Sequence, residues 1–322
     1  MFVVTGAAGF VGYNFVKFLN KQKITDIIII DNLEQGKKWK KFIDLHFHEY
    51  VDYKEGTESV KRALDKYEIK AFFHIGANAD VLCNDNTLML DQNYSQTKFH
   101  FEYCQSKNIP LIYASTSAVY GNSEACKPIW EYEQPHNIYA MSKLMFDNFF
   151  RSSLARGNVS TKVVGLRLFN IFGPGEEHKG PNASLPKRFF DFTIEKKFID
   201  VFSDEIARDY VFVEDVCKVF WHAYEQQIPS GVYNLGTGST ISHVEIAQIT
   251  QKCAIECGVE YAKLENFITR INMPDSLAGA FQFYTRAQDV PNWISNIVIN
   301  SLEKMEQYSG NLFLEYKKGG KL

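Results

Sequence analysis

Short apolar runs alternate with longer amphipathic segments through the first half of the chain, and the apolar runs predict buried strands. These strands are expected at 2–4, 27–31, 71–75, 110–114 and 162–169. Apolar residues at helical spacing predict helices between the strands, the clearest over 87–107 and 137–153. Regular alternation of strand and helix predicts an α/β fold with a doubly wound parallel sheet.

The pattern loosens after residue 174, where a polar segment rich in glycine and proline extends to Pro186. A strand at 232–236 and a helix at 242–257 follow, with irregular segments around them. We therefore expect a dinucleotide-binding domain over 1–170, with some later segments returning to it. Residues 171–322 would form mainly a smaller, mixed α/β substrate-binding lobe. The polar end from Tyr316 onward offers little to bury and is expected to be frayed.

The first strand runs into glycines spaced G-x-x-G-x-x-G, and a helix follows them. A glycine turn lets the backbone approach a pyrophosphate, which the positive end of the helix then faces. The second strand ends in Asp31, an acid about 20 residues further on that is placed to bind an adenosine ribose. A mononucleotide-binding or vestigial unit is the alternative. The contacts expected here come from Gly6, Gly9, Phe10, Val11, Gly12 and Asp31.

Tyr139 and Lys143 lie four residues apart in a predicted helix, so their side chains share one face. A nearby ammonium favours the phenolate and lowers the pKa of a tyrosine from its usual value of roughly 10. Such a pair can move a proton to or from a sugar hydroxyl near neutrality. The carboxyl ends of the parallel strands meet at one edge, where ligands bind in such sheets. That edge gathers the glycine loop, residues 74–77, the 115–117 cluster and Asn170.

The net charge, the lengths of the apolar runs and the cysteine spacing argue against several classes of function. The chain has 322 residues and a net charge of −3, so no basic field argues for a nucleic-acid partner. No apolar run approaches the roughly 20 residues that span a bilayer. The six cysteines lie far apart without Cys-x-x-Cys pairs, so no metal site is expected. Cys253 and Cys257 share a helical face and are expected to be core thiols of a reduced, cytoplasmic protein.

The chain resembles the extended short-chain dehydrogenase/reductase superfamily over almost its whole length. The glycine motif, Asp31, residues 113–121 and the Tyr139–Lys143 pair carry the resemblance. It implies a Rossmann-type fold, a nicotinamide cofactor and, in many members, a nucleotide-sugar substrate. Thr116 would hydrogen-bond the reacting sugar oxygen, with Ser117 beside it, and Lys143 would also hold the nicotinamide ribose. Simple strand capping is the alternative for Ser115 and Ser117. Three further cofactor contacts are implied, at Ile75, Ala77 and Asn93.

Within the superfamily, the chain looks most like the family of ADP-L-glycero-D-manno-heptose 6-epimerases. The matching stretches are 31–38, 167–174, 177–180 and 208–213 with 234–238. This resemblance implies inversion at C6 of ADP-D-glycero-D-manno-heptose through oxidation and re-reduction. Tyr139 would act on one side of the carbon and Lys179 on the other. The substrate contacts would be Ser117, Asn170, Arg208 and Phe281.

Several of these residues have simpler alternative roles that involve no catalysis. Lys179 would otherwise be a solvated lysine or a diphosphate contact, and Arg208 would otherwise pair with Asp209. Ile75 and Phe281 depart from the family pattern, which has a glutamate and a tyrosine at these positions.

The choice between NADP and NAD is open from the residues alone. Asp31 favours a free 2′-hydroxyl and hence NAD. Lys37, Lys38 and Lys54 can balance the charge of a 2′-phosphate, and Asn32 adds a neutral contact. The resemblance favours NADP, with Lys38 as the chief phosphate partner and NAD still possible. The alternative is that the lysines of 37–41 form a solvated face.

Rival functions remain on the same scaffold. Another NAD(P)-dependent nucleotide-sugar epimerase, a reductase or a decarboxylase is the nearest rival. A 4,6-dehydratase is disfavoured because Ser117 and Ala118 stand where that class has Asp-Glu. A non-enzymatic NADP-sensing protein is disfavoured because Tyr139 and Lys143 are both present. The resemblance further implies a homo-oligomer, a pentamer, and a role in making the heptose of lipopolysaccharide.

Overall fold

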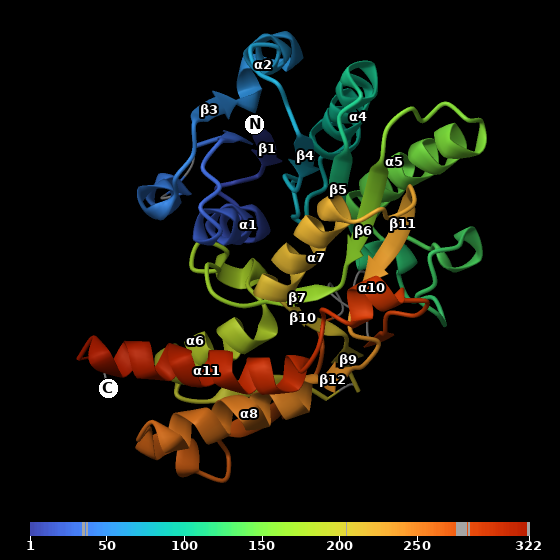
Figure 1. The fold of residues 1–322 in the computed structure, drawn as a ribbon. Helices are drawn as coiled ribbons and strands as arrows, with labels where there is room; N and C mark the ends of the chain where they lie inside the picture. The colour runs from blue at the N-terminus through green and yellow to red at the C-terminus, as the bar shows by residue number, and fades with distance from the viewer. Residues whose placement is uncertain (34–35, 37, 204, 275–281, 283, 321–322) are drawn as a thin grey trace.

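A seven-stranded parallel sheet forms the centre of the computed structural model (Figure 1), which describes residues 1–33, 36, 38–203, 205–274, 282 and 284–320. The strand order is β11-β6-β5-β4-β1-β2-β3, and every neighbouring pair is parallel. The predicted doubly wound parallel sheet is therefore confirmed. The strands are β1 (Phe2–Thr5), β2 (Ile27–Asp31), β3 (Glu49–Asp52), β4 (Ala71–His74), β5 (Leu111–Thr116), β6 (Val163–Leu168) and β11 (Gly231–Leu235).

Successive residues of each strand face opposite layers of helices. Phe2 and Val4 pack with α1 (Phe10–Lys21) and α7 (Val213–Glu225), whereas Val3 belongs to the core on the other face. That second layer consists of α2 (Thr57–Leu64), α4 (Gln96–Lys107) and α5 (Ile138–Ala155). Because both faces are covered, the central strands are rich in apolar residues on both faces instead of alternating regularly with polar residues.

The predicted helix over 87–107 is three consecutive segments. It starts as α3 (Asn86–Met89), where the Asp85 side chain accepts a hydrogen bond from the Leu88 backbone N–H. A π-helical turn, η3 (Leu90–Ser95), then leads into α4. Such turns occur mostly inside α-helices and often at functional sites. The other short helices are η1 (Lys38–Asp44), η2 (Tyr53–Glu55), η4 (Ser117–Tyr120), η5 (Trp130–Tyr132), η6 (Gly180–Asn182), η7 (Glu260–Lys263) and α10 (Asn292–Ser295).

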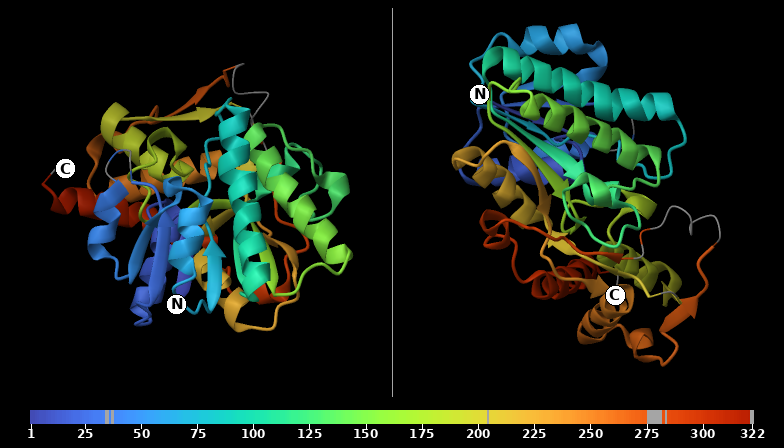
Figure 2. Two further views of the ribbon diagram at one scale, coloured as in Figure 1. Left: turned by 90° about the horizontal axis from the view of Figure 1, so that it is seen from above. Right: turned by 90° about the vertical axis from the view of Figure 1, so that its right-hand side faces the viewer.

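A second core lies beyond the carboxyl ends of the sheet strands (Figure 2). The helices α6 (Leu185–Lys196), α8 (His243–Glu256) and α11 (Ser301–Lys318) surround it. Because β11 lies between this lobe's segments in sequence but belongs to the main sheet, the chain crosses between the two cores more than once. The lobe's strands pair as β8 (Ile199–Phe202) with β13 (Ile268–Ile271), β7 (Asn170–Phe172) with β10 (Tyr210–Phe212), and β9 (Ala207–Arg208) with β12 (Ile241–Ser242) and β14 (Tyr284–Thr285).

The expectation of a tail frayed from Tyr316 onward is wrong for its first residues. Helix α11 continues to Lys318, and the side chain of Phe313 is fully buried in the lobe core. Lys317 Nζ donates a hydrogen bond to the Cys257 carbonyl oxygen at 3.0 Å. Apolar residues one and two turns earlier therefore anchor a polar stretch that looks featureless by itself.

All six cysteines are free thiols, and Cys253 and Cys257 are buried in the lobe core as expected. Among the residues that the structure describes, no helix is long and apolar enough to cross a bilayer.

Candidate active site

The glycines between β1 and α1 are required by close backbone approach. Gly6 has φ +71°, and a Cβ there would lie 2.6 Å from Gly76 Cα. At Gly12 a Cβ would lie 2.1 Å from the Gly6 carbonyl oxygen. Gly9 begins α1 without a side-chain cap, so the N–H groups of its first turn, at Phe10 and Val11, are left to a ligand. These features fit a dinucleotide pyrophosphate at the start of α1.

Asp31 ties the end of β2 to the glycine loop. Its Oδ2 accepts a hydrogen bond from the Ala8 N–H at 2.7 Å, and its Oδ1 accepts one from the Asn32 N–H at 2.7 Å. Burial raises the pKa of Asp31, while these hydrogen bonds and the charges of Lys38 and Lys41 oppose the rise. Lys38 is thus within electrostatic reach of the ribose position.

Lys54 lies in η2, directly after the neighbouring strand β3, which pairs with β2 in the register Asp31↔Asp52 and ends at Asp52. Only Tyr53 lies between Lys54 and that strand end. The sheet therefore brings the predicted ribose acid and the segment with Lys54 to one edge.

A buried polar chain orders the segment after β4. The Gly76 N–H donates to Thr5 Oγ1 at 2.9 Å, and Thr5 Oγ1 in turn lies 2.8 Å from His74 Nδ1. Burial is the main cause that lowers the pKa of His74 well below its usual value, so the ring is neutral. Ile75 follows as a buried residue, whereas Ala77 is exposed.

Asn93 is fully buried in the π-helical turn, where protein groups engage its amide. Its Nδ2 donates to the Asn78 carbonyl oxygen at 2.9 Å and to Ser142 Oγ at 3.1 Å, and its Oδ1 accepts from the Asn78 N–H at 2.8 Å. Ser142 Oγ donates to the Tyr139 carbonyl oxygen at 2.7 Å. Asn93 therefore holds the segment after β4 against the helix that carries Tyr139.

Tyr139 lies in the first turn of α5, which Asn137 caps through a hydrogen bond from the Ala140 N–H at 2.8 Å. Burial raises the pKa of Tyr139, and a hydrogen bond with the Thr116 side chain opposes the rise. Thr116 ends β5 and is itself buried, as is its neighbour Ser117. The structure thus brings the predicted tyrosine and threonine together. The Thr116 side chain thus favours the phenolate of Tyr139, and the role of Lys143 in lowering this pKa stays a prediction.

Lys143 is 4% exposed and interacts with Asp147, one helical turn further along α5. Burial lowers the pKa of Lys143 to about 8, and the Asp147 charge opposes this effect. Asp147 is fully buried and accepts hydrogen bonds from Tyr113 OH and Ser115 Oγ, both at 2.9 Å. Ser115 therefore links β5 to α5, and strand capping does not describe it.

Asp147 belongs to a larger buried network. Arg167 on β6 donates to Asp147 Oδ2 through Nε at 2.9 Å, and its Nη2 lies 2.7 Å from Glu133 Oε1. Its Nη1 donates to Tyr120 OH at 3.1 Å, and Tyr120 OH donates to Asn234 Oδ1 at 2.6 Å. These contacts join α5, β6 and β11 beneath Tyr139 and Lys143. The sequence reasoning missed Asp147, although its position four residues after Lys143 was a usable signal.

The predicted substrate residues Asn170 and Arg208 lie on adjoining short strands of the lobe. Asn170 Nδ2 donates to the Asp209 carbonyl oxygen at 3.1 Å, and Arg208 donates to the Gln282 carbonyl oxygen through Nε at 2.9 Å. The Asp209 carboxylate accepts the N–H groups of Thr237 and Gly238, each at 2.8 Å. Asp209 is thus engaged by backbone groups, which disfavours it as the ion-pair partner of Arg208. Phe281 lies outside the described residues.

A second arginine, Arg188 on α6, was missed by the sequence reasoning. Burial lowers the pKa of Arg208, Tyr210 opposes this, and the like charge of Arg188 lowers the pKa further. Burial and the same two arginines lower the pKa of His243 to about 3. Arg188 and Arg208 thus act electrostatically on the same part of the lobe, and guanidinium groups are suited to bind an anion such as a diphosphate. No local pattern reveals this convergence, because Arg188 and Arg208 lie on different elements.

Lys179 is carried by the loop 173–184 and faces the first turn of α1. Its Nζ lies 5.0 Å from the centre of the Phe10 ring and 3.6 Å from Glu176 Oε2. Burial is the main cause that lowers the pKa of the adjacent His178 to about 4, so His178 is neutral near pH 7. His178 is therefore uncharged beside Lys179.

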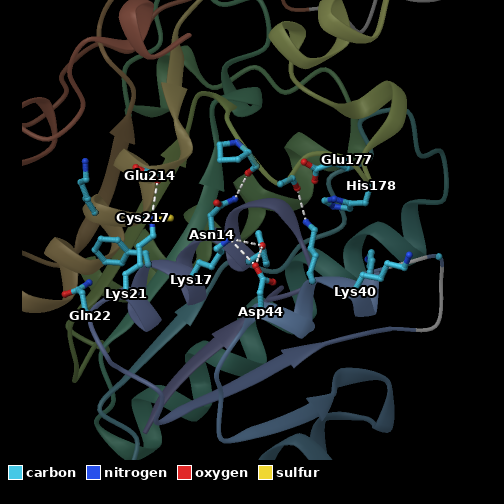
Figure 3. A pocket seen from close by; sticks show the side chains of 18 residues that line it. Asn14, Lys17, Lys21, Gln22, Lys40, Asp44, Glu177, His178, Glu214 and Cys217 are labelled. Atoms are coloured by element: carbon cyan, nitrogen blue, oxygen red, sulfur yellow. Dashed lines mark hydrogen bonds and ion pairs between the residues drawn. The ribbon is translucent and has the colours of Figure 1, made fainter. Parts of the chain in front are cut away.

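A cavity of about 1150 Å³ lies beside this loop, between α1, η1 and the start of α7 (Figure 3). Lys17 and Lys21 line its α1 side, and Glu177 and His178 line its loop side. Lys17 pairs with Asp44 at 3.1 Å and Lys21 with Glu214 at 3.5 Å. The charges of Lys17 and Lys21 are thus paired within the protein, and Lys38, Lys40 and Lys41 line the same cavity.

Comparison with known proteins matches the chain to a family of epimerases and dehydratases. Residues 2–236 match the model of the NAD dependent epimerase/dehydratase family. An ADP-L-glycero-D-manno-heptose-6-epimerase from Brachyspira hyodysenteriae is 36% identical over 291 residues, which cover 89% of each chain.

Two solved structures are similar along nearly the whole chain. The ADP-L-glycero-D-manno-heptose-6-epimerase of Helicobacter pylori superposes with a TM-score of 0.80 at 28% identity, covering 97% of this chain and 96% of that one. A UDP-N-acetylglucosamine 4-epimerase from Methanobrevibacter ruminantium also has a TM-score of 0.80, at 22% identity, with 99% and 98% covered. The second likeness is evidence for the fold alone. With its family match and its relative at 36% identity, the chain belongs to the NAD dependent epimerase/dehydratase family.

Proposed function

We propose that this enzyme inverts C6 of ADP-D-glycero-D-manno-heptose to give ADP-L-glycero-D-manno-heptose. The observation that carries the proposal is that Tyr139 and Lys179, which we assign as the two proton-transfer groups, are held by separate parts of the chain. Tyr139 contacts Thr116 at the end of β5, and Lys179 faces Phe10 at the start of α1. Support comes from the relative of 36% identity, which has this activity in its name.

The glycine loop fits a nicotinamide dinucleotide, because a Cβ at Gly6 or Gly12 would collide with backbone. When bound, the cofactor would accept a hydride from C6 and return it. Gly6, Gly9, Gly12 and Asp31 would hold the pyrophosphate and ribose, and Lys143 the nicotinamide ribose. Ile75 and Ala77 would line the same site, and Asn93 would support it through Asn78.

In the proposed mechanism, the sugar oxygen exchanges its proton with a different protein group on each side of the reacting carbon. Tyr139 would take the proton of the 6-hydroxyl on one face, with Thr116 bonded to the same oxygen. The resulting 6-keto sugar would present its other face to the cofactor, and Lys179 would donate the proton to its oxygen as the hydride returns. An acid or base positioned in this way contributes about 10²–10⁴-fold to a rate.

The nucleotide end of the substrate would bind the lobe. Arg208 and Arg188 would hold the diphosphate, since an anion between them would oppose the burial and the like charge of Arg188 that lower the pKa of Arg208. Ser117 and Asn170 would contact the sugar. A role for Phe281 remains a prediction.

We propose NADP as the cofactor, with Lys38 as the chief partner of the 2′-phosphate and Asn32 and Lys54 beside it. The charge of Lys38 already reaches Asp31 and opposes the rise of its pKa. Lys38→Ala should weaken NADP binding about tenfold more than NAD binding, measured by fluorescence titration of the cofactor-free enzyme. Lys40→Ala, on the exposed side of η1, is the matched control. An equal loss of affinity for the two cofactors would argue against a contact between Lys38 and a 2′-phosphate and would favour NAD.

The substrate test is direct. The enzyme is mixed with ADP-D-glycero-D-manno-heptose and the C6 configuration is followed by NMR, with UDP-glucose and UDP-N-acetylglucosamine as comparison substrates. The proposal predicts conversion of the heptose and much slower turnover of the hexoses. Turnover of a hexose nucleotide without conversion of the heptose would instead identify another epimerase, reductase or decarboxylase on the same scaffold.

A homo-oligomer, with five copies as the expected number, also belongs to this proposal. So do a cytoplasmic location and a role in supplying the heptose of lipopolysaccharide. Sedimentation of the purified protein tests the first of these.

A further inference from the structure

Lys41 joins the cofactor loop to the loop that carries Lys179. It lies in η1, and its Nζ donates to the Gly9 carbonyl oxygen at 3.1 Å and to the Gly175 carbonyl oxygen at 2.9 Å. Gly9 begins α1, and Gly175 lies four residues before Lys179. One ammonium group thus bridges two backbone segments that are 166 residues apart in sequence and belong to the two halves of the site.

The surroundings of Lys41 differ from those of a solvated lysine. Burial lowers its pKa to about 8. The charges of Glu177 and Asp31 oppose this, while Lys179 lowers the pKa further. The predicted ribose acid and the predicted second acid/base therefore both act on the same ammonium. A solvated face for residues 37–41 does not describe Lys41.

The loop also contacts α1 directly beside this bridge. Asn14 Nδ2 donates to the Pro174 carbonyl oxygen at 2.9 Å and to the Phe10 carbonyl oxygen at 2.9 Å. Gly175 has φ +99°, and a Cβ there would lie 3.1 Å from Asn14 Nδ2. The base of the loop is thus packed against the turn of α1 whose Phe10 ring lies under Lys179. Small shifts of this base would displace Lys179.

We propose that Lys41 is a positioning residue that fixes Lys179 relative to the cofactor by fastening the 173–184 loop to the glycine loop. This inference rests on the proposed function, because it assumes that Lys179 is one of two acid/base groups. It also implies an asymmetry. Tyr139 is held by the sheet and α5, so loss of Lys41 should impair proton transfer on the Lys179 side alone.

The test isolates one half of the reaction. Enzyme in excess, loaded with the reduced cofactor, is given the 6-keto nucleotide sugar, and the ratio of the two C6 epimers is measured after a single turnover. Each epimer receives its proton from one of the two groups, so the ratio reports their relative efficiency. Lys179→Met should shift the ratio toward the epimer whose proton comes from Tyr139. The direction of this shift identifies which of the two epimers that is.

Lys41→Met should shift the ratio in the same direction by about tenfold, since a displacement near 1 Å can reduce a rate by up to 10²-fold. Lys41→Arg keeps donors for both carbonyl oxygens and should recover most of the wild-type ratio. Lys40→Met, the exposed neighbour, should leave the ratio unchanged.

The possible failures are distinguishable. An unchanged ratio in Lys179→Met would refute the two-base function itself. A shifted ratio in Lys179→Met with an unchanged one in Lys41→Met would overturn the role of Lys41 alone. Weaker cofactor binding in Lys41→Met, with both epimers slowed equally, would make Lys41 a cofactor ligand and also overturn the proposal. Circular dichroism and the thermal midpoint identify any variant that fails to fold, in which case Lys41→Arg and Lys41→Gln carry the test.

Discussion

The two proposed proton-transfer groups are supported in opposite ways. Tyr139 lies on a helix of 18 residues whose buried face is connected to β5 and β6 by Asp147 and Arg167. Lys179 lies on a loop between two glycines with positive φ, Gly175 at +99° and Gly180 at +50°, and its side chain is 27% exposed. The position of Lys179 therefore depends on a few local contacts, chiefly its own with Glu176 and that of Lys41 with Gly175.

This difference suggests a division of labour. A group held by the sheet keeps its geometry with or without substrate, whereas a group on a loop can adjust when the sugar changes the face that it presents. Binding and catalytic groups are frequently carried by loops on a rigid scaffold. Mutations on the helix side should therefore affect stability and chemistry together, and those on the loop side mainly chemistry.

The largest expected effect is at Tyr139. Tyr139→Phe removes the phenol hydroxyl but keeps the ring, so epimerisation should fall by about 10³-fold, within the range for a general acid or base. The measurement is the initial rate of C6 inversion by NMR. Bound cofactor, released by denaturation and quantified, should remain at the wild-type level. A rate within tenfold of wild type would remove Tyr139 from the mechanism and reverse the comparison.

The second prediction concerns the network beneath the helix. Asp147→Asn removes a buried carboxylate that Arg167 contacts through Nε and Nη2, both at 2.9 Å. Leaving a buried charge short of its partner costs about 3 kcal/mol of unfolding free energy, measured by urea denaturation. Asp191→Asn breaks the partly exposed pair with Lys187 on α6 and should cost less than about 1 kcal/mol. Equal losses in the two variants would contradict the special role of the network.

Asp147→Asn should also shift the pH dependence of kcat in a defined direction. The Asp147 charge opposes the burial that lowers the pKa of Lys143 to about 8, so without it this pKa should fall further. Lys143 would lose its proton earlier, and the alkaline limb of kcat should move to lower pH. The stability of the wild-type protein should change in the opposite direction. Between pH 8 and the ordinary lysine pKa of 10.5, Lys143 binds more protons in the unfolded chain than in the folded one. Its contribution to the free energy of unfolding therefore rises with pH over this range. An alkaline limb that does not move would exclude Lys143 as its source.

Sequence reasoning was most successful where one local rule determines the structure. The glycines between β1 and α1, the apolar strands and the Tyr139 helix each follow from spacing within a short window, and the structure contains all of them. The buried charges were missed because their partners lie far away in sequence, outside any short window. Lys41 lies in a run of lysines that reads as a solvated face, and its two acceptors are distant in sequence.

Arg167 illustrates the same limit. A strand of apolar residues predicts burial but not which carboxylates neutralise a charge within it. Its partners Asp147 and Glu133 come from α5 and from the segment before that helix. Only the packing of α5 on β6 brings them together. Arg188 and Arg208 converge for a similar reason, since α6 and β9 meet only in the folded lobe.

The smallest expected effect tests the loop side. Glu176 is 1% exposed, and its Oε2 accepts the Ser184 N–H at 2.6 Å while lying 3.6 Å from Lys179 Nζ. Glu176→Gln keeps the shape of the side chain but removes the charge opposite Lys179 and places donors near Ser184. Because these contacts fix only the loop, kcat should fall by about tenfold, well within the 10²-fold cost of a displacement near 1 Å.

The matched control for this prediction is Glu177→Gln, since Glu177 is adjacent and exposed. It should retain nearly the wild-type kcat. The thermal midpoint of Glu176→Gln should change much less than that of Asp147→Asn, because the carboxylate of Glu176 organises a loop whereas Asp147 joins three elements of the core. A large fall in the thermal midpoint with an unchanged kcat would show that the loop supports the fold instead of the chemistry. The two sides of the site would then differ in exposure alone.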